Sequence, residues 1–496
     1  MNRVELRALV PFLLLLLVSS APAADTEWKS TRVFTVAEAD SMARERQPVT
    51  VSTSCAATSE KALEHGVFLF EGVPAAGKEV ACQVHDVRQQ DSGTAFKVTF
   101  LCSLAAGESK TYTLAWDGKK KRSPARAGDE GWVSGSGLQL ALENEFYCLT
   151  TSAETGGAVQ DLVNKLGSGK LLQAHLGPLD WSPSVAAPRH PDSTRGIFWM
   201  GAHYCRWFTP PEYKVQAGPV FIQIERSGYL PVQFEKEEEE HQVPHLDQKL
   251  HVTLTYRFYR DLPFFISERL LAVDEDFPLL LLRHNQWVFR KGLFTHAFFK
   301  NRSPDIDRRL DDDEIGFMTF EVDERIIPDH HSLGAVVPEN IPWLAFANIH
   351  DGDGFADIRL EFRAWNALDP GLPPVFYHPR TYLPNHQGVN YWFKSISYVY
   401  TYRGENGPGF TVVIPAGSRY YERQANLVFR YQHPEDTNVR RHDPWDSSWV
   451  GKLALHANLY HEGRKAIFPV EKYHWLLTHP LRVTLPGDQA AHRADD

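Results

Sequence analysis

The chain has few cysteines, and none of them are closely spaced. Only 5 of its 496 residues are cysteine, at positions 55, 82, 102, 148 and 205. This number and spacing exclude a disulfide scaffold and a cysteine-rich metal site. The sequence leaves open one disulfide among Cys55, Cys82 and Cys102, because all three lie in the N-terminal region.

Clustered basic charge and long apolar runs are also scarce. The formal net charge is −10, and no basic block extends beyond Lys119–Arg122. Because phosphate binding needs a clustered basic face, nucleic acid is not an expected partner. No internal run reaches the length of a membrane-spanning helix, so we expect no membrane association of the mature chain.

The first 23 residues have the form of a secretory signal peptide. Arg3 and Arg7 supply positive charge, Val10–Val18 is a short apolar core, and Ala21 and Ala23 supply small residues for cleavage. We therefore expect a secreted or periplasmic protein. An uncleaved membrane anchor is the alternative reading of this segment.

Beyond the signal peptide, short alternating apolar segments separated by Gly, Pro and polar turns predict strands. They predict an all-β fold with few helices, and no long helices of the kind that build an (α/α) toroid. We expect a small N-terminal β-sandwich or barrel at 31–117, a linker at 118–131, a large antiparallel β-supersandwich at 132–485, and a disordered tail at 486–496. One short helix is expected at Thr35–Glu45, where Thr35 and Glu38 have the spacing of a capping box.

The segment Glu143–Leu172 predicts a hairpin. One strand leads into Gly156-Gly157, a second strand leads out, and another turn follows at Gly167–Gly169. Paired glycines supply the positive φ that a tight turn needs. This segment resembles the opening hairpin of the C-terminal β domain of α-mannosidases. That domain is similar to the galactose-mutarotase-like supersandwich of carbohydrate-active enzymes, including polysaccharide lyases, so the resemblance implies this fold and a carbohydrate ligand.

Three segments combine aromatic rings with hydrogen-bonding side chains, as sugar sites do. They are Gly201–Tyr213 with the preceding loop Asp180–Arg195, Arg283–Trp287, and Tyr377–Trp392. The last contains two prolines and a glycine, which favours a binding loop. The first is equally consistent with buried aromatic residues. In the second, polar groups follow a Leu run, which is consistent with a concave sheet face or with a hydrogen-bonded network inside the sandwich.

Two chemistries suit such a protein. Hydrolysis of a glycosidic bond needs two carboxylates at a fixed separation, for which Asp180 and Glu212 are candidates. β-Elimination from a uronic acid needs a cation to neutralise the carboxylate and a His or Tyr to move protons. The three segments are rich in His, Tyr, Arg and Asn, so we favour a polysaccharide lyase over a hydrolase and over a non-catalytic carbohydrate-binding module.

The residues expected to serve this site fall into two groups. The catalytic candidates are His203, Tyr204, Arg206, Tyr377, His378, Arg380 and Tyr382. The substrate-binding candidates are Trp181, Trp207, His284, Asn285, His386, Asn390 and Trp392. The sequence predicts a polysaccharide or oligosaccharide substrate and no firm cofactor. Calcium is a candidate at Asp351–Gly354 with Asp357, although a plain Asp-Gly turn is favoured because the full calcium-loop pattern is missing.

Overall fold

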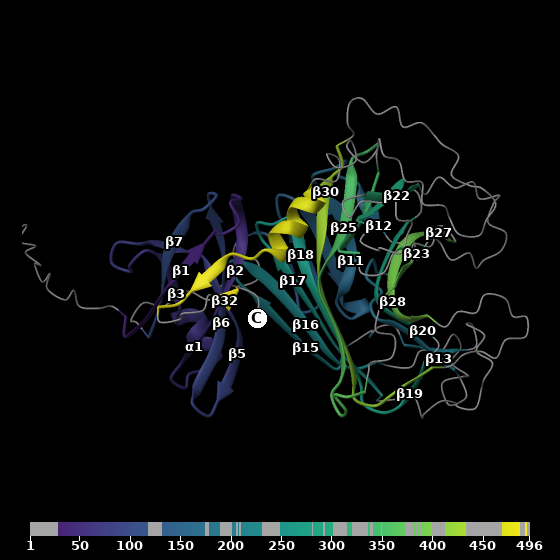
Figure 1. Cartoon of the computed structure of the whole chain (residues 1–496), viewed down its shortest axis with the longest axis horizontal. Coiled ribbons are helices and arrows are strands. Elements are labelled where there is room, and N and C mark those ends of the chain that lie inside the picture. The colour runs from purple at the N-terminus through teal and green to yellow at the C-terminus, as the bar shows by residue number, and fades with distance from the viewer. Residues whose placement is uncertain are drawn as a thin grey trace, which may run out of the picture.

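The computed structural model of the chain confirms the predicted all-β class (Figure 1). It describes residues 28–117, 131–173, 178–188, 201–204, 207, 210–230, 249–279, 281–290, 293–300, 315–319, 336–337, 341–348, 350–372, 380–382, 385–386, 389–398, 412–432, 469–486 and 492–493. The predicted signal peptide lies outside these residues, as does the predicted linker apart from Gly131. Nearly all described elements are antiparallel strands.

The N-terminal region is a two-sheet sandwich. Its six-stranded sheet has the order β32 (His492–Arg493), β31 (Arg482–Thr484), β1 (Ser30–Ala37), β7 (Ser109–Trp116), β3 (Phe68–Glu71) and β4 (Lys78–Val80). Its three-stranded sheet has the order β2 (Arg44–Cys55), β6 (Gly93–Leu104) and β5 (Cys82–Gln90). Phe34, Val49, Phe100 and Leu114 belong to the buried cluster that the two sheets share. Helix α1 (Glu60–Gly66) is capped by Ser59, whose side chain accepts a hydrogen bond from the Ala62 N–H.

The predicted helix at Thr35–Glu45 is wrong. Residues up to Ala37 form β1, and β2 begins at Arg44. Strand β1 pairs along its whole length with β7, and Thr35 also lies opposite Thr484 of β31. This ladder on both sides outweighs the local capping pattern, because a short helix is marginal without tertiary packing.

The structure also decides the disulfide that the sequence left open, and it places the last described strands differently from the expected domain bounds. No disulfide joins Cys55, Cys82 and Cys102, and the Cys102 Sγ lies 3.3 Å from the Tyr112 hydroxyl instead. Strand β31, expected at the end of the large domain, belongs to the N-terminal sheet. Strand β32 lies inside the predicted tail and pairs with β31.

The large domain contains three main sheets. A five-stranded sheet has the order β12 (Leu171–Gln173), β11 (Ala158–Asn164), β10 (Tyr147–Ser152), β9 (Gln139–Glu143) and β8 (Val133–Ser136). The second is a seven-stranded sheet. Six of its strands follow the order β14 (Gly201–Tyr204), β13 (Ser184–Pro188), β20 (Leu281–Arg290), β28 (Val389–Tyr398), β26 (Arg380–Tyr382) and β23 (Val336–Val337), and the seventh, β27 (Asn385–His386), also pairs with β28.

The nine-stranded sheet runs through the centre of the domain. Its order is β15 (Glu212–Ala217), β16 (Phe221–Tyr229), β17 (Leu250–Tyr259), β18 (Phe264–Val273), β30 (Ser418–Arg430), β25 (Asp353–Asn366), β24 (Trp343–Ala347), β21 (His296–Lys300) and β22 (Ile315–Thr319). A small two-stranded sheet pairs β19 (Phe277–Leu279) with β29 (Val412–Ile414). One buried cluster contains Leu149 of the five-stranded sheet, Trp287 of the seven-stranded sheet and Phe355 of the nine-stranded sheet, so the nine-stranded sheet faces the other two.

The predicted hairpin at Glu143–Leu172 is confirmed. Strands β10 and β11 pair antiparallel, and a single turn of 3-10 helix, η1 (Ala153–Thr155), precedes Gly156 and Gly157. Both glycines have positive φ, +62° and +81°. A Cβ at Gly156 would lie 2.3 Å from the Trp207 carbonyl oxygen, so the turn packs closely against the next part of the domain.

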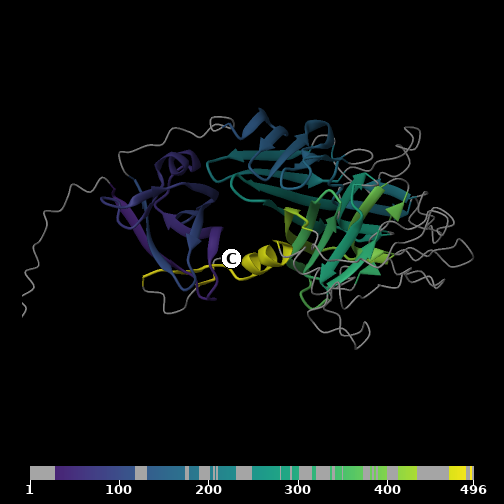
Figure 2. The same cartoon turned by 90° about the horizontal axis from the view of Figure 1, so that it is seen from above.

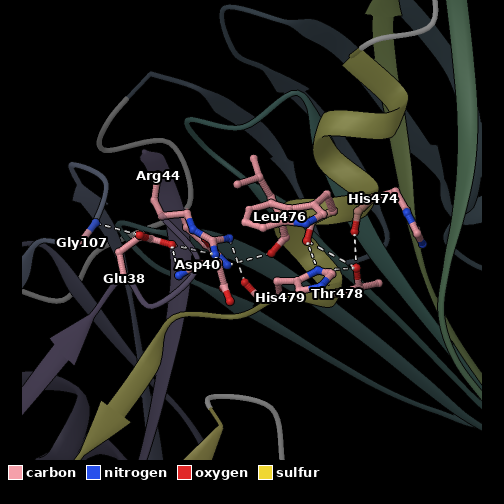
Figure 3. Close-up of polar contacts among 10 residues, drawn as sticks. Glu38, Asp40, Arg44, Gly107, His474, Leu476, Thr478 and His479 are labelled. Carbon is pink, nitrogen blue, oxygen red and sulfur yellow. Dashed lines mark hydrogen bonds and ion pairs between the residues drawn. The ribbon is translucent and has the colours of Figure 1, made fainter. Parts of the chain in front are cut away.

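Residues 469–478 form a helix that returns the chain to the N-terminal sandwich (Figures 1 and 2). Val470, Tyr473 and Leu477 pack against the outer face of the nine-stranded sheet. Arg44 of β2 holds the end of this helix, because it donates a hydrogen bond to the His479 carbonyl at 2.8 Å (Figure 3). Its guanidinium carbon also lies 4.3 Å from the centre of the Trp475 ring. Arg44 also pairs with Glu38 at 3.3 Å and Asp40 at 2.7 Å.

Within the part of the chain that the structure describes, no helix is both long and apolar enough to cross a membrane.

Candidate functional site between two sheets

Charged and amide side chains lie buried where the nine-stranded sheet faces the seven-stranded sheet. Asp180 is the central carboxylate, and it reaches this position because its backbone forms a bridge with Trp287 of β20. Its Oδ2 accepts hydrogen bonds from the Tyr256 hydroxyl at 2.6 Å and from Arg269 Nη2 at 2.8 Å. Its Oδ1 accepts one from the Ser182 N–H at 2.9 Å. The carboxylate is thus held by strands β17 and β18.

A row of hydrogen bonds connects this ion pair to the opposite sheet. Asn285 of β20 donates to Gln424 at 2.5 Å, and Gln424 donates to Asn426 at 3.1 Å. Asn426 donates to the Ser267 hydroxyl at 2.8 Å, and that hydroxyl also accepts from Arg269 Nη1 at 3.3 Å. Asn285 donates a second, longer hydrogen bond to the Asp357 carboxylate at 3.3 Å. The network therefore continues from one sheet to the other.

The strands bring these side chains together because each contributes alternate positions to the inner face. Glu422, Gln424 and Asn426 are spaced by two along β30, as are Ser267 and Arg269 along β18. Neighbouring strands continue the rows, since Ser267 lies opposite Gln424 and Arg269 lies opposite Glu422. We call the set of Asp180, Tyr256, Ser267, Arg269, Asn285, Asp357, Glu422, Gln424 and Asn426 the inner polar cluster; every member is buried.

Burial and the nearby carboxylates set the ionisation of the cluster. Burial lowers the pKa of Arg269, but Asp180, Tyr256 and Glu422 act in the opposite direction and raise it above its usual value. Burial first, and then the Asp180 charge, raises the pKa of Tyr256. Tyr256 therefore keeps its proton at neutral pH and acts as a hydrogen-bond donor, while Arg269 remains a cation.

Buried polar atoms in or beside the cluster that have no hydrogen-bond partner among the described residues include Asn285 Oδ1 and Arg226 Nε. Arg226 stacks over the Tyr256 ring, with its guanidinium carbon 4.7 Å from the ring centre, and donates to the Gly156 carbonyl at 3.1 Å. Unsatisfied buried donors and acceptors are uncommon in native proteins.

The three predicted segments all contribute strands to the seven-stranded sheet. His203 and Tyr204 lie on β14, Arg380 and Tyr382 on β26, and Asn390 and Trp392 on β28. His386 lies on β27. Along the register, Arg283 and Arg380 both lie opposite Ser395 of β28. Two arginine positions therefore occur in one row of the sheet, separated by a single strand.

The structure describes only the backbone at these β14, β26, β27 and β28 positions, and Arg206, Tyr377 and His378 lie outside the described residues. Among the remaining candidates, His284 and Asn285 are buried on β20, and Asn285 belongs to the inner polar cluster. Of the two alternatives for Arg283–Trp287, a concave sheet face or a hydrogen-bonded network inside the sandwich, the buried network describes Asn285. Trp181 is half-buried, and its backbone N–H donates to the Gln286 carbonyl at 2.9 Å.

Trp207 needs correction as a stacking platform for sugar. Its side chain is 3% exposed and packs with Val185, Leu230 and Leu282. Its indole N–H donates to the Tyr229 carbonyl at 2.7 Å. Trp207 is therefore a core residue with one hydrogen bond, which is the alternative that the sequence left open for this segment.

Sequence reasoning missed most of the inner polar cluster. Tyr256, Ser267, Arg269, Gln424 and Asn426 are not among the candidates, because the candidates were chosen from short segments in which aromatic and hydrogen-bonding residues gather. A signal was present: polar residues at every second position of a long strand, as in Glu422, Gln424 and Asn426, predict a polar stripe on one sheet face.

The candidate calcium loop is engaged in contacts with the protein itself. Asp351 pairs with Lys170 at 2.6 Å, and Asp353 accepts from the backbone N–H and the hydroxyl of Ser168. Asp357 lies in the inner polar cluster instead. Among the described residues no group of three or more His, Cys, Asp or Glu side chains could hold a metal ion. The contacts at Asp351 and Asp353 fit the plain Asp-Gly turn.

No family model and no curated protein matches the chain. Among solved structures it is similar to an α-mannosidase from Enterococcus faecalis V583, with 11% identity and a TM-score of 0.46 over 94% of this chain and 46% of that one. It is also similar to a galactose mutarotase-like protein from Lactobacillus casei ATCC 334, with 11% identity and a TM-score of 0.32 over 58% of this chain and 99% of that one. A third similar structure is a putative aldose 1-epimerase from Escherichia coli K12, with 8% identity and a TM-score of 0.29. The match covers 58% of this chain and 98% of that one.

The hairpin at 143–172 resembles the β domain of the first group, the α-mannosidases, and that domain is in turn similar to the galactose-mutarotase-like fold of the second group. The chain spans about half the length of the α-mannosidase structures it matches, 46% and 48%. All these TM-scores lie below 0.5, so the likenesses assign no reaction, substrate or site residue to this chain.

Proposed function

We propose that this chain is a secreted or periplasmic carbohydrate-active enzyme, a polysaccharide lyase that cleaves a uronic-acid-containing glycan by β-elimination. The observation that carries the proposal is the seven-stranded sheet. It joins the three His-, Tyr- and Arg-rich segments, which are far apart in the sequence, as neighbouring strands.

The reaction assigns a role to each kind of side chain. A cation neutralises the uronate carboxylate, which acidifies the C5 proton. A His or Tyr base removes that proton, the C4–C5 double bond forms, and the glycosidic C4–O bond breaks. A second group returns a proton to the leaving oxygen. No water is consumed, and the new non-reducing end is an unsaturated uronate.

The candidates divide among these roles as follows. His203 or His378 serves as the base, and Tyr204, Tyr377 or Tyr382 serves as the base or the acid. Arg380 or Arg206 neutralises the carboxylate. Arg283 joins this group, because it lies in the same row as Arg380. The row that contains Arg283 and Arg380 supports a site in which guanidinium groups surround one carboxylate. Guanidinium groups commonly form bidentate hydrogen bonds to a carboxylate.

A glycoside hydrolase is the second candidate, and the inner polar cluster favours it in one respect. Asp180 and Glu422 are buried carboxylates that both act on Arg269. A hydrolase needs two carboxylates flanking one bond. The pair predicted from sequence is less suitable, because Glu212 is exposed on edge strand β15 whereas Asp180 is buried.

The test is a panel of pectin, alginate, glucuronan and glycosaminoglycans. Ultraviolet absorbance of the unsaturated uronate and release of reducing ends are followed together. We expect both signals to rise. Arg380→Ala should reduce the rate about a hundredfold or more, the loss typical of removing one group that stabilises transition-state charge. Arg290→Ala is the matched control, since Arg290 is an exposed arginine at the end of β20 in the same sheet.

Two other results contradict the lyase proposal, and a third contradicts only the role given to Arg380. Reducing ends without ultraviolet absorbance mean hydrolysis. Binding without either signal means a non-catalytic carbohydrate-binding protein. Absorbance that is equally strong in Arg380→Ala removes Arg380 from its role.

A further inference from the structure

The outer face of the nine-stranded sheet has two halves with different composition. Near the helix at 469–478 it carries Ile266, Ala425 and Leu427, all fully buried in one apolar cluster with residues of that helix. Among the described residues, no element covers the other half in this way. There the positions that alternate with the inner polar cluster carry aromatic and charged residues, among them Tyr421, which precedes the inward-facing Glu422.

We define the outer aromatic face by Tyr229, His251, Arg363, Trp365 and Tyr421. Strands β16, β17, β30 and β25 carry these residues, and β18 lies between β17 and β30 in the same sheet (Figure 1). Trp365 is 38% exposed and Tyr229 is 39% exposed, and both count among the exposed large hydrophobic residues of the described chain. Side chains of this size rarely remain uncovered without a use when they gather on one surface.

The aromatic groups lie in rows that cross the strands. Tyr229 lies opposite His251, and their rings meet edge to face with centres 5.2 Å apart. The same row continues through Ala272 and Arg419 to Trp365. Tyr229 and Trp365 are therefore four strand spacings apart, about 19 Å at ~4.8 Å per spacing. This separation suits a ligand of several sugar rings and exceeds a single sugar.

The second row adds a guanidinium between two rings. Arg363 lies opposite Tyr421, and its guanidinium carbon is 5.1 Å from the centre of the Tyr421 ring and 6.0 Å from that of Trp365. This contact holds the aromatic side chains in place, because a cation over a ring face is attracted to it. A pre-ordered aromatic surface loses less entropy when a ligand binds.

The arginines of this face are already paired with carboxylates. Arg363 pairs with Glu361 at 2.6 Å, Arg419 with Asp274 at 3.2 Å, and Arg423 with Glu268 at 3.9 Å. A polyanion would have to break these pairs to gain its contacts. The face therefore suits a neutral ligand that offers apolar C–H surfaces to rings and hydroxyls to charged groups.

We propose that the outer aromatic face binds an extended neutral glycan chain lying across the strands. The carbon-bound hydrogens of its sugar rings pack on Trp365 and Tyr229, and its hydroxyls bond to the paired Arg and Glu side chains between them. This surface is on the opposite side of the sheet from the inner polar cluster, so binding here is separate from the proposed elimination.

Native affinity electrophoresis in gels containing xylan, galactomannan, mixed-linkage β-glucan or starch tests the proposal. We expect at least one neutral polysaccharide to retard the wild-type chain. Trp365→Ala should weaken the retardation constant about tenfold, as truncating a central aromatic anchor does. Trp365→Tyr should recover part of the loss. Val413→Ala is the matched control, because Val413 is 53% exposed on β29, outside this face.

Equal retardation of Trp365→Ala and wild type overturns the proposal, as does absence of retardation in every neutral gel. Self-association that disappears in Trp365→Ala, measured by sedimentation, also overturns it and identifies a second copy of the chain as the occupant. Turnover of uronate glycans is measured on the same variants. Loss of retardation with unchanged turnover supports a separate site, while absence of turnover in wild type contradicts only the lyase proposal.

Discussion

At the scale of single residues, the inner polar cluster depends on one buried ion pair. Arg269 and Asp180 have side chains that are each 2% exposed. Taking either charge out of water is expensive, and the expense is recovered only if the partner and the remaining hydrogen bonds are in place. Asp180 meets this condition, because Tyr256 and the Ser182 N–H complete its coordination.

Arg269→Met should therefore destabilise the protein by about 3–5 kcal/mol, since it leaves the Asp180 carboxylate buried without its cation. Urea unfolding at neutral pH measures the change. Lys165→Met is the control: its pair with Glu143 is 3.0 Å long but exposed, and its loss should change stability by less than about 1 kcal/mol. Similar losses in both variants would show that burial does not determine the contribution of Arg269.

The candidate residues show which residue-level inferences can be made from sequence. Asn285 was predictable because a polar side chain directly after a Leu run must be paired or face a cavity. The burial of Trp207 was not predictable. A Trp near an Arg and two prolines has the same local sequence pattern whether it lies at the rim of a binding site or in the domain core. Only the neighbouring strands decide its burial, and they come from distant parts of the chain.

At the scale of elements, the turn at Gly156-Gly157 connects the opening hairpin to the rest of the domain. Gly156 has φ of +62°, and an added Cβ would meet the Trp207 carbonyl oxygen and carbon at 2.3 and 3.1 Å. Its own carbonyl accepts from Arg226. The residue thus combines positive φ with close backbone approach.

Gly156→Ala should be more destabilising than Gly169→Ala, and thermal unfolding of the two variants measures the difference. Gly169 also has positive φ, +74°, but a Cβ there would meet nothing within 4 Å. Both variants carry the cost of positive φ, about 1–2 kcal/mol. Only Gly156→Ala adds the clash, on the order of 1–3 kcal/mol. Equal losses would mean that the turn can move away from Trp207.

Most strands could be predicted from sequence, because period-two alternation is a local property. Strand β17 (Leu250–Tyr259), for example, alternates buried and partly buried side chains along nearly its whole length. The helix expected at Thr35–Glu45 failed for the opposite reason, since β1 is fixed by pairing with β7 and β31, and neither is near it in sequence. The pairing of the three candidate segments in one sheet could not be predicted, because strand order is not encoded in any one segment.

At the scale of the whole molecule, Glu38 supports the contact between the N-terminal sandwich and the helix at 469–478. It lies beside Arg44 and accepts from the backbone N–H groups of Gly107 and Asp40, each at 2.8 Å (Figure 3). Burial raises the pKa of its carboxyl, but these two hydrogen bonds and the Arg44 guanidinium together lower it below 4.5. The ionised form is therefore favoured in the folded state.

The contribution of Glu38 to stability should be present above about pH 4.5, the usual pKa of a Glu carboxyl, and be lost as the pH falls through the folded-state pKa. Glu38→Gln should lower stability at neutral pH and flatten the decline in stability below pH 4.5, as followed by urea unfolding at stepped pH. Tyr112→Phe in the same sandwich is the control, because burial raises its pKa and it does not titrate in acid. A decline in Glu38→Gln parallel to that of wild type would contradict this assignment.

Strand β31 has a consequence for how the chain folds while it is being made. It pairs with β1, although β1 emerges from the ribosome long before β31. Until then the N-terminal sandwich has β1 as an open edge, and open edges recruit other strands. Nascent chains held short of residue 482 should therefore aggregate or bind chaperones through β1, and synthesis of β31 should end that exposure.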